Sequence, residues 1–375
     1  MLRVLLALVL ATLSLDAAAQ RPPLVVPDDP ATVLERLPEG YAELMPRAGD
    51  APASLERIEA LLRTAARTGD ARLVARAEGE LARFPQGGNA PAALRARAYV
   101  AQYRHDFEKA REWLDRLVAI APRDGDALLA RAQMSLVQGR LDEARADCSA
   151  LAFGVDSGRG LLCVAALSQR CGEAAAAARL LDRWLALAAA GDPDALRFAL
   201  VMRAEAASHA GDADADEWFR RALELAPDDV RTLAAYSRHL RGDGRADEAF
   251  ALLPENPVSE HLQLERALAA QAAGLSQAPA LIEALARLYR RAHAIGAEPD
   301  LRDEAEFLLT LRDDSAAALP LAQRNFDSQR DREDVDLLRR AAAAAGRPEA
   351  LAQLRAWAVS QSLELPATGA GEDEA

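Results

Sequence analysis

The apolar positions along the chain recur with the spacing of amphipathic helices. Apolar side chains that return every three or four positions share one face of an α-helix. The stretches 55–68 and 71–84 form the first such pair, with Gly69-Asp70 between them. The same alternation of helical stretches and short breaks continues to about residue 362. The pattern predicts an all-α fold made of consecutive helix pairs.

One short motif returns at a period near 34 residues. Its marker is an alanine near the start of the second helix of each pair, at Ala110, Ala144, Ala177, Ala215 and Ala249. A glycine precedes most of these alanines, at Gly139, Gly172, Gly211 and Gly244. Four residues after each alanine stands a larger side chain, at Leu114, Cys148, Leu181, Phe219 and Leu253. A period of this length is the signature of a repeat architecture.

These residues resemble the tetratricopeptide repeat. The best single unit is 211–227, where Ala215, Phe219 and Ala222 are followed by Pro227. The usual tryptophan and leucine-glycine pair of the first helix are absent, and small residues such as Ala98, Ala132 and Ala165 take the small position. The resemblance covers 90–255 clearly and 53–362 with less regular units. The chain is also similar to uncharacterised exported repeat proteins of proteobacteria.

The resemblance implies an α-solenoid of stacked antiparallel helix pairs. A single pair cannot bury its own apolar face, so neighbouring pairs must stack. Beyond the clear repeats, Pro348 suits the first turn of the last helix, and Pro320 is expected to bend the helix that contains it. The later helices are expected at 260–273, 277–295, 301–311, 315–328, 333–345 and 348–360.

The two ends of the chain are expected to lie outside the solenoid. Residues 1–19 combine Arg3, an apolar run and three alanines before Gln20, which is the pattern of a cleavable signal peptide cut after Ala19. An uncleaved membrane anchor is the rival interpretation, although the run is shorter than the ~20 residues that span a bilayer. An extended arm is expected at 20–52 and a disordered acidic tail at 363–375. The mature protein is expected to be periplasmic or secreted, with no membrane insertion.

The charge and the residue inventory exclude several classes of function. A net charge of −13, with a single lysine at Lys109, argues against nucleic acid as a partner, because phosphate binding requires clustered positive charge. The histidines are scattered, and no catalytic, phosphate-binding or metal-binding motif is present. We therefore expect neither an enzyme, nor a cofactor, nor a metal site.

Three cysteines in an exported chain raise the question of a disulfide. Cys163 and Cys171 are eight residues apart on one predicted helix, so their Cα atoms lie ~12 Å apart, which is too far for a bond. Cys148 and Cys163 flank the turn between two antiparallel helices at almost equal distances. We predict a disulfide between Cys148 and Cys163, with Cys171 as the leftover thiol. The alternative is three buried thiols that pack as small apolar side chains.

In repeats of this type the first helix of each unit lines a concave groove, and residues at i, i+4 and i+7 or i+8 face together. An aromatic pair flanked by arginines is suited to holding an extended peptide or a carboxylate. The set expected to contact a partner is Arg95, Tyr99, Tyr103, Gln133, Arg170, Glu205, His209 and Arg238. An ordinary solvated concave surface would show the same pattern.

The sequence thus favours a non-catalytic scaffold that binds a protein or peptide of unknown identity through this groove. The alternative is a self-associating structural repeat protein of the cell envelope, which would stack through its terminal repeats.

Overall fold

The computed structural model describes residues 54–84, 89–187, 192–361 and 363. The expected signal peptide, the expected arm at 20–52 and all of the tail except Leu363 lie outside the described residues. Within the described part of the chain, every regular element is a helix. The predicted all-α class is therefore confirmed.

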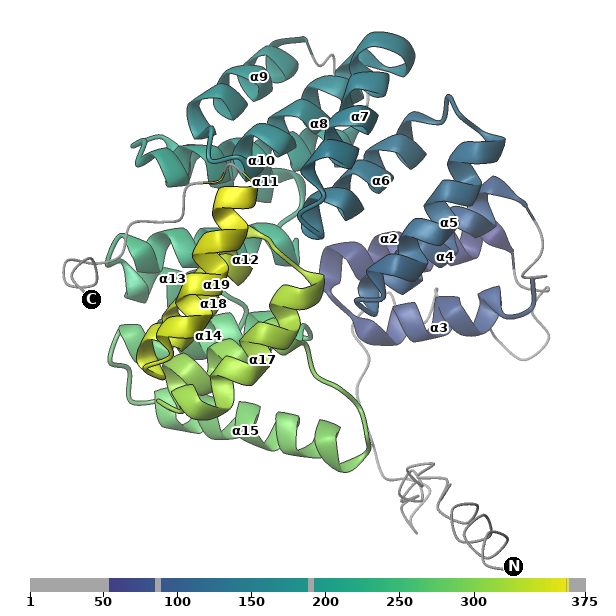
Figure 1. Cartoon of the computed structure of the whole chain (residues 1–375). Helices are drawn as coiled ribbons and strands as arrows, with labels where there is room; N and C mark the ends of the chain where they lie inside the picture. Colours follow the sequence, from purple (N-terminus) through teal and green to yellow (C-terminus); the bar gives the residue numbers. More distant parts are fainter. Residues whose placement is uncertain (1–53, 85–88, 188–191, 362, 364–375) are drawn as a thin grey trace, which may run out of the picture.

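The helices follow one another in antiparallel pairs, each formed by a first and a second helix of one unit (Figure 1). The second helix of the third unit and the first helix of the eighth each continue into a five-residue π-helix, η1 and η2. The bounds are α2 Leu55–Thr68, α3 Ala71–Leu81, α4 Pro91–Tyr103, α5 Phe107–Ile120, α6 Gly125–Val137, α7 Leu141–Ala150, η1 Leu151–Val155, α8 Ser157–Arg170, α9 Ala174–Leu187, α10 Pro193–Ala210, α11 Ala215–Leu225, α12 Val230–Gly242, α13 Ala246–Leu252, α14 Glu260–Ala272, α15 Ala278–Ala294, α16 Leu301–Glu306, η2 Phe307–Leu311, α17 Ser315–Ser328, α18 Arg332–Ala344 and α19 Pro348–Ser360.

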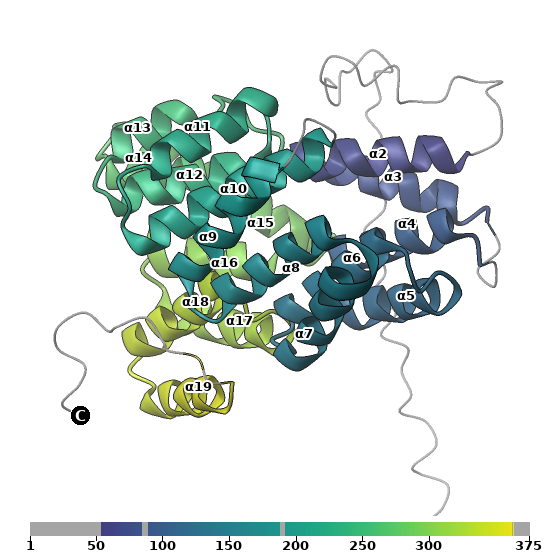
Figure 2. The same cartoon turned by 90° about the horizontal axis from the view of Figure 1, so that it is seen from above.

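Consecutive pairs stack into a curved α-solenoid, as Figure 2 shows from above. The first helices of most neighbouring units contact one another, and each second helix packs against its own first helix. The architecture predicted from the 34-residue period is thus confirmed.

The recurring alanines lie where the two helices of a unit cross. Ala110, Ala144 and Ala177 are completely buried, and the small residues Ala132 and Ala165 of the first helices are equally buried. A larger side chain at these positions would hold the axes apart, and alanine is also the best helix former. The recurring alanine motif therefore reflects close packing between the two helices of a unit.

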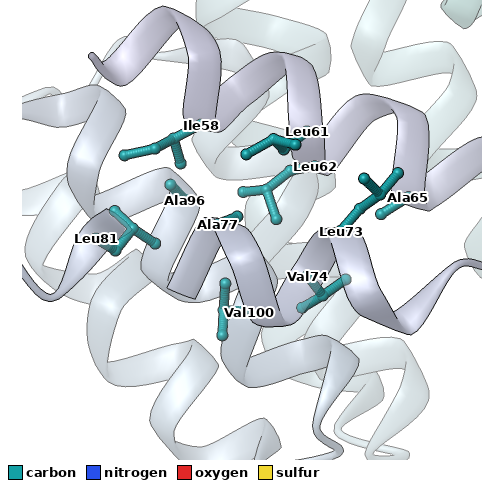
Figure 3. Packing of buried hydrophobic residues seen from close by; sticks show 10 residues of the cluster. All are labelled: Ile58, Leu61, Leu62, Ala65, Leu73, Val74, Ala77, Leu81, Ala96 and Val100. Atoms are coloured by element: carbon teal, nitrogen blue, oxygen red, sulfur yellow. The ribbon is translucent and has the colours of Figure 1, made fainter. Parts of the chain in front are cut away.

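The first two units share one apolar core (Figure 3). It joins side chains from three helices, namely Ile58, Leu61, Leu62 and Ala65 of α2, Leu73, Val74, Ala77 and Leu81 of α3, and Ala96 and Val100 of α4. Each large aliphatic side chain buried in this way stabilises the fold by about 1.5–3 kcal/mol. Because α4 belongs to the second unit, the first pair depends on its neighbour for burial.

The solenoid curls until its early turns meet its late helices. A side chain added at Gly69, which follows α2, would come within 2.9 Å of Ser259 at the start of α14. The N–H of Arg330, just before α18, donates to the carbonyl of Val137 at the end of α6 over 2.7 Å. In the early units, a turn follows each first helix. These turns therefore face the N-terminal ends of the first helices in the late units. This closure was not anticipated from the sequence.

Candidate partner-binding surface

The expected contact residues all lie on first helices. Arg95, Tyr99 and Tyr103 are on α4, and Gln133 is half-buried on α6. The remaining four are distributed over the next three first helices, with Arg170 on α8, Glu205 and His209 on α10 and Arg238 on α12. The structure divides this set into two groups with different surroundings.

The aromatic pair on α4 packs against the first unit. Tyr99 and Tyr103 are partly buried against the apolar core of α2 and α3. Burial, followed by the nearby carboxylate of Glu260, raises the pKa of Tyr103 to about 12. On the same helix, Arg95 donates to Asp124 over 2.6 Å. Tyr103 therefore stands between the first unit and acidic side chains from the later part of the chain.

The second group meets the beginning of α18, which lies on the concave face. A guanidinium nitrogen of Arg170 is 4.0 Å from the carboxylate of Asp331, and one of Arg238 is 3.8 Å from Glu333. Burial and the neighbouring Arg332 lower the pKa of His209. The chain's own segment 331–333 thus occupies part of the surface expected to hold a partner.

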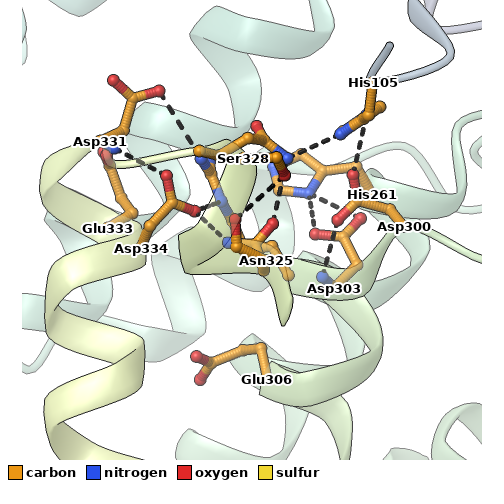
Figure 4. Close-up of polar contacts among 12 residues, drawn as sticks. His105, His261, Asp300, Asp303, Glu306, Asn325, Ser328, Asp331, Glu333 and Asp334 are labelled. Atoms are coloured by element: carbon orange, nitrogen blue, oxygen red, sulfur yellow. Dashed lines mark hydrogen bonds and ion pairs between the residues drawn. The ribbon is translucent and has the colours of Figure 1, made fainter. Parts of the chain in front are cut away.

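Side chains from α16 and α17 hold this segment in place, and Figure 4 shows the surrounding polar contacts. Asp334 accepts hydrogen bonds from Arg302 and from the Asn325 amide, both at 2.6 Å. Its other oxygen accepts from the backbone N–H of Asp331 at 2.7 Å, which closes a capping box at the start of α18. His261 on α14 contacts Asp303 on α16 at 2.8 Å. The segment is therefore rigidly positioned.

The charges of this surface are strongly coupled. Burial opposes ionisation of Glu333, but Arg238 and Arg302 outweigh it and lower its pKa to about 2. Burial raises the pKa of Asp331 to about 6, although Arg170 acts in the opposite direction. Even so, 34% of the Arg238 side chain and 39% of the Glu333 side chain remain accessible to solvent. These two groups are therefore partly exposed on the concave face.

A separate cavity of about 560 Å³ lies at the C-terminal half of α15. Leu288 and Ile295 provide apolar lining, Arg287 and Arg291 provide positive charge, and Glu260 at the start of α14 lies opposite. Glu260 is also one of the carboxylates that raise the pKa of Tyr103.

Cys148 on α7 and Cys163 on α8 form a disulfide, the pair expected from the sequence, with their Cα atoms 5.2 Å apart. Cys171 is a free, half-buried thiol. Burial and the neighbouring Glu173 raise its pKa. The disulfide ties the third unit to the fourth.

Two further properties concern the described residues only. No group of three or more His, Cys, Asp or Glu side chains among them is arranged to hold a metal ion. Among the helices in the described ranges, none combines the length and the apolar character needed to cross a membrane.

Sequence reasoning missed the residues that cover the concave face. In the sequence, 331–334 is a polar run at the start of a predicted helix, and acidic residues at a helix start ordinarily serve as caps. Asp331 and Asp334 do cap α18. They also face arginines from α8 and α16. These contacts join residues more than 30 positions apart, so the local sequence pattern does not reveal them.

No protein-family model matches the sequence, and no curated protein matches it. Among solved structures, the chain is similar to a tetratricopeptide repeat protein from Parabacteroides merdae, with 20% identity over 68% of this chain and 99% of that one and a TM-score of 0.41. It is also similar to the Cut9–Hcn1 hetero-tetramer of APC/C, with 15% identity, 83% and 63% coverage and a TM-score of 0.46. The human IFIT1 dimer with PPP-AAAA has 13% identity, 83% and 86% coverage and a TM-score of 0.45. At these identities the likeness concerns the fold alone.

Proposed function

We propose that the protein is a non-catalytic scaffold of the bacterial periplasm or secreted space that binds a protein or peptide on its concave face. Solenoids of stacked helix pairs generally use such extended concave surfaces for binding. The observation that carries the proposal is the charged cluster of Glu205, His209 and Arg238. These side chains belong to α10 and α12, two first helices that contact each other.

The chemistry of this interior suits a peptide that carries both signs of charge. Glu205 accepts a hydrogen bond from Arg231 over 2.9 Å. His209 lies beside this pair; its side chain keeps access to solvent, although the surrounding protein desolvates it enough to lower its pKa. Arg238 is shared between Glu265 at 3.3 Å and Glu333 at 3.8 Å. Glu265 is buried, but both partners of the Arg231–Glu205 and Arg238–Glu333 pairs are partly exposed. Such pairs contribute little to stability, so a peptide with complementary charges can exchange with them at small cost.

Photo-crosslinking from the concave face tests this proposal. A photoreactive amino acid in place of His209 should crosslink a discrete set of periplasmic proteins. The same amino acid in place of Glu217, an exposed residue of the outer helix α11, is the matched control. Adding Arg238→Glu to the His209 probe should reduce its crosslinks at least about fivefold. If the Glu217 position captures the same proteins with equal yield, the concave face is not the binding surface.

The proposed location has its own test, independent of binding. When the full chain is expressed in a Gram-negative bacterium, osmotic shock should release it, and its first residue should be Gln20. An intact Met1 in the cytoplasmic fraction would contradict an exported scaffold.

A second candidate function, self-association, is favoured by the exposed apolar residues. Four large side chains protrude at the ends of successive second helices, where the chain turns toward the next unit. They are Ile120 at the end of α5, Phe153 in η1, Leu187 at the end of α9 and Leu225 at the end of α11. Equivalent helix ends lie along one edge of a solenoid, and rows of exposed apolar side chains commonly mark interaction sites.

Light scattering over a hundredfold range of concentration tests this candidate. Self-association through the edge predicts a mass that rises with concentration, and the combined Phe153→Ser and Leu187→Ser substitutions should abolish the rise. Val359→Ser, at an exposed apolar residue on α19, is the control. A constant monomer mass would remove the self-association candidate.

A further inference from the structure

Arg170, the last residue of α8, is buried without adequate partners. Only 8% of its side chain is exposed, and the Asp331 carboxylate is 4.0 Å from one terminal nitrogen, beyond hydrogen-bonding distance. Its Nε and its second terminal nitrogen are buried and have no hydrogen-bond partner. A buried guanidinium in this state costs several kcal/mol unless an anion compensates it. The site around Arg170 is therefore suited to binding a negatively charged group.

Two more arginines approach the same place. The Arg330 side chain passes over Gly139, and its guanidinium lies 5.8 Å from the centre of the Trp357 ring. Burial lowers the pKa of Arg330, the nearby carboxylate of Asp327 opposes this shift, and the guanidinium groups of Arg140 and Arg170 add to it. A Cβ at Gly139, the residue before Arg140, would lie 3.1 Å from the Cδ of Arg330, and Asp331, the residue after Arg330, faces Arg170, so the three arginines share one region.

Several donors at this place are buried without an acceptor. Arg330 uses its Nε for the carbonyl of Phe326 at 3.1 Å, and the described residues provide it with no carboxylate within 4.0 Å. The indole N–H of Trp357 is also buried without an acceptor. Arg140 is partly compensated, because it pairs with Glu108. Buried donors without acceptors, next to three guanidinium groups, form a site suited to a carboxylate.

The chain returns to this site after its last helix. Leu363 packs into the apolar cluster formed by Leu136, Leu141 and Leu167, where Cys171 is a further neighbour. Its N–H donates to the carbonyl of Ala358 at 2.9 Å. Leu167 lies one turn before Arg170 on α8, and Cys171 follows it directly. The segment after Leu363 therefore begins beside the three arginines.

The residues that follow carry the complementary charge. Between 364 and 375 there are four acidic residues, Glu364, Glu372, Asp373 and Glu374, and no basic residue. An extended segment of this length reaches up to about 40 Å, so each of these carboxylates can reach Arg170. Because the segment is tethered next to the site, its effective concentration there is in the millimolar range.

We propose that Arg140, Arg170 and Arg330 form a carboxylate-binding site whose ligand is the chain's own acidic segment 364–374. The carboxylates supply the acceptors that Arg170 and Arg330 lack. This inference stands independently of the proposed scaffold function.

The free thiol of Cys171 provides a reporter in the full chain. A Glu372→Cys variant places a second thiol in the acidic segment, and glutathione disulfide then drives formation of a 372–171 disulfide, followed by mass spectrometry. If the segment docks, adding Arg330→Met should slow the crosslink about tenfold, and so should 0.5 M NaCl. Alkylation of Cys171 by iodoacetamide in each variant corrects for changes in its intrinsic reactivity.

Two comparisons make the outcome decisive. Arg179→Met changes an exposed arginine of α9 for which no carboxylate of the described chain lies within pairing distance, and it should leave the rate unchanged.

If Arg330→Met impairs folding, the combined changes Glu364→Gln, Asp373→Asn and Glu374→Gln in the Glu372→Cys chain should cause the same slowing without altering the folded core. Equal rates in the Arg330→Met, Arg179→Met and tail-neutralised chains would overturn the proposal. A rate that rises with protein concentration would overturn it as well, because the ligand would then come from another molecule.

Discussion

The imidazole Nε2 of His105 lies 3.1 Å from a carboxylate oxygen of Asp300. His105 ends the first helix of the second unit, and Asp300 caps α16 in the eighth. The Nδ1 of the same ring is 2.6 Å from the amide nitrogen of Gln329. One side chain thus connects the early turns of the solenoid to the late first helices.

His105 also adopts a backbone conformation that disfavours most residues. Its φ is +58°, at a turn where the neighbouring units have glycine, and a Cβ in this region costs about 1 kcal/mol. We expect His105→Ala to destabilise the protein by about 1–2 kcal/mol, because the strain stays and the contacts are lost. His105→Gly should cost less, since glycine relieves the strain. Urea denaturation followed by circular dichroism measures both.

A double-mutant cycle isolates the His105–Asp300 contact. Asp300→Asn keeps the helix cap, so the coupling with His105→Ala should be about 0.5 kcal/mol, typical of a partly exposed pair. Strictly additive effects would show that the two side chains do not interact in solution.

The pKa of Asp331 predicts a particular pH dependence of stability. Its folded-state value of about 6 lies above the ordinary 3.8, so the folded state binds this proton more tightly than the unfolded state. The associated stabilisation is present below pH 4 and is lost as the pH rises through 6. Asp331→Asn should therefore have little effect at pH 4.5 and should stabilise by about 1 kcal/mol at pH 7.5, after allowance for solvent screening. Thermal melts at the two pH values test this, and asparagine preserves the N-cap.

Glu333, two residues after Asp331, is expected to give stability the opposite pH dependence. Its pKa is about 2, below the ordinary 4.5, so its contribution is present above pH 4.5 and is lost as the pH falls toward 2. Glu333→Gln should lower the melting temperature at pH 7.5, where Asp331→Asn raises it. Shifts of the same sign would contradict the arrangement of charges around α18.

The disulfide between Cys148 and Cys163 closes a loop with a sequence separation of 15. Such a loop stabilises by about 3 kcal/mol in the chain-entropy model. Cys163→Ser should lower the stability by about this amount, and dithiothreitol should have a comparable effect on the wild type. Alkylation of the unfolded, unreduced chain should label one thiol, Cys171. Two or three labelled thiols would show that the bond does not form.

Gly160 is required by close packing between α8 and η1. A Cβ at this position would lie 2.3 Å from the Cα of Ala152, a backbone atom that cannot move alone. Gly160→Ala should destabilise by about 1–3 kcal/mol, as overpacking does. Gly79, inside α3, meets nothing within 4 Å, so Gly79→Ala should stabilise by about 0.5–1 kcal/mol. Measuring both by urea denaturation separates the effect of packing from that of helix propensity.

The local pattern of the sequence was sufficient for the helices and their pairing. The alanines at Ala110 and Ala144 mark crossings between helices that are adjacent in the chain, and the predicted stretch 277–295 matches α15 to within one residue at each end. The second helix of the first unit ends at Leu81 rather than at the expected residue 84. These features depend on interactions over a few turns, which a linear pattern records well.

The sequence by itself determined an all-α chain of stacked pairs and the candidate residues on the first helices. Only the tertiary structure decided that α18 covers part of the concave face, and that Arg170 lies near Arg330 and Leu363. The physical reason is that curvature accumulates from a small rotation at each interface between units, so residues more than 150 positions apart meet only after many such rotations. A repeat motif specifies each interface, whereas the contacts between the early and late units depend on the sum of all the interfaces between them.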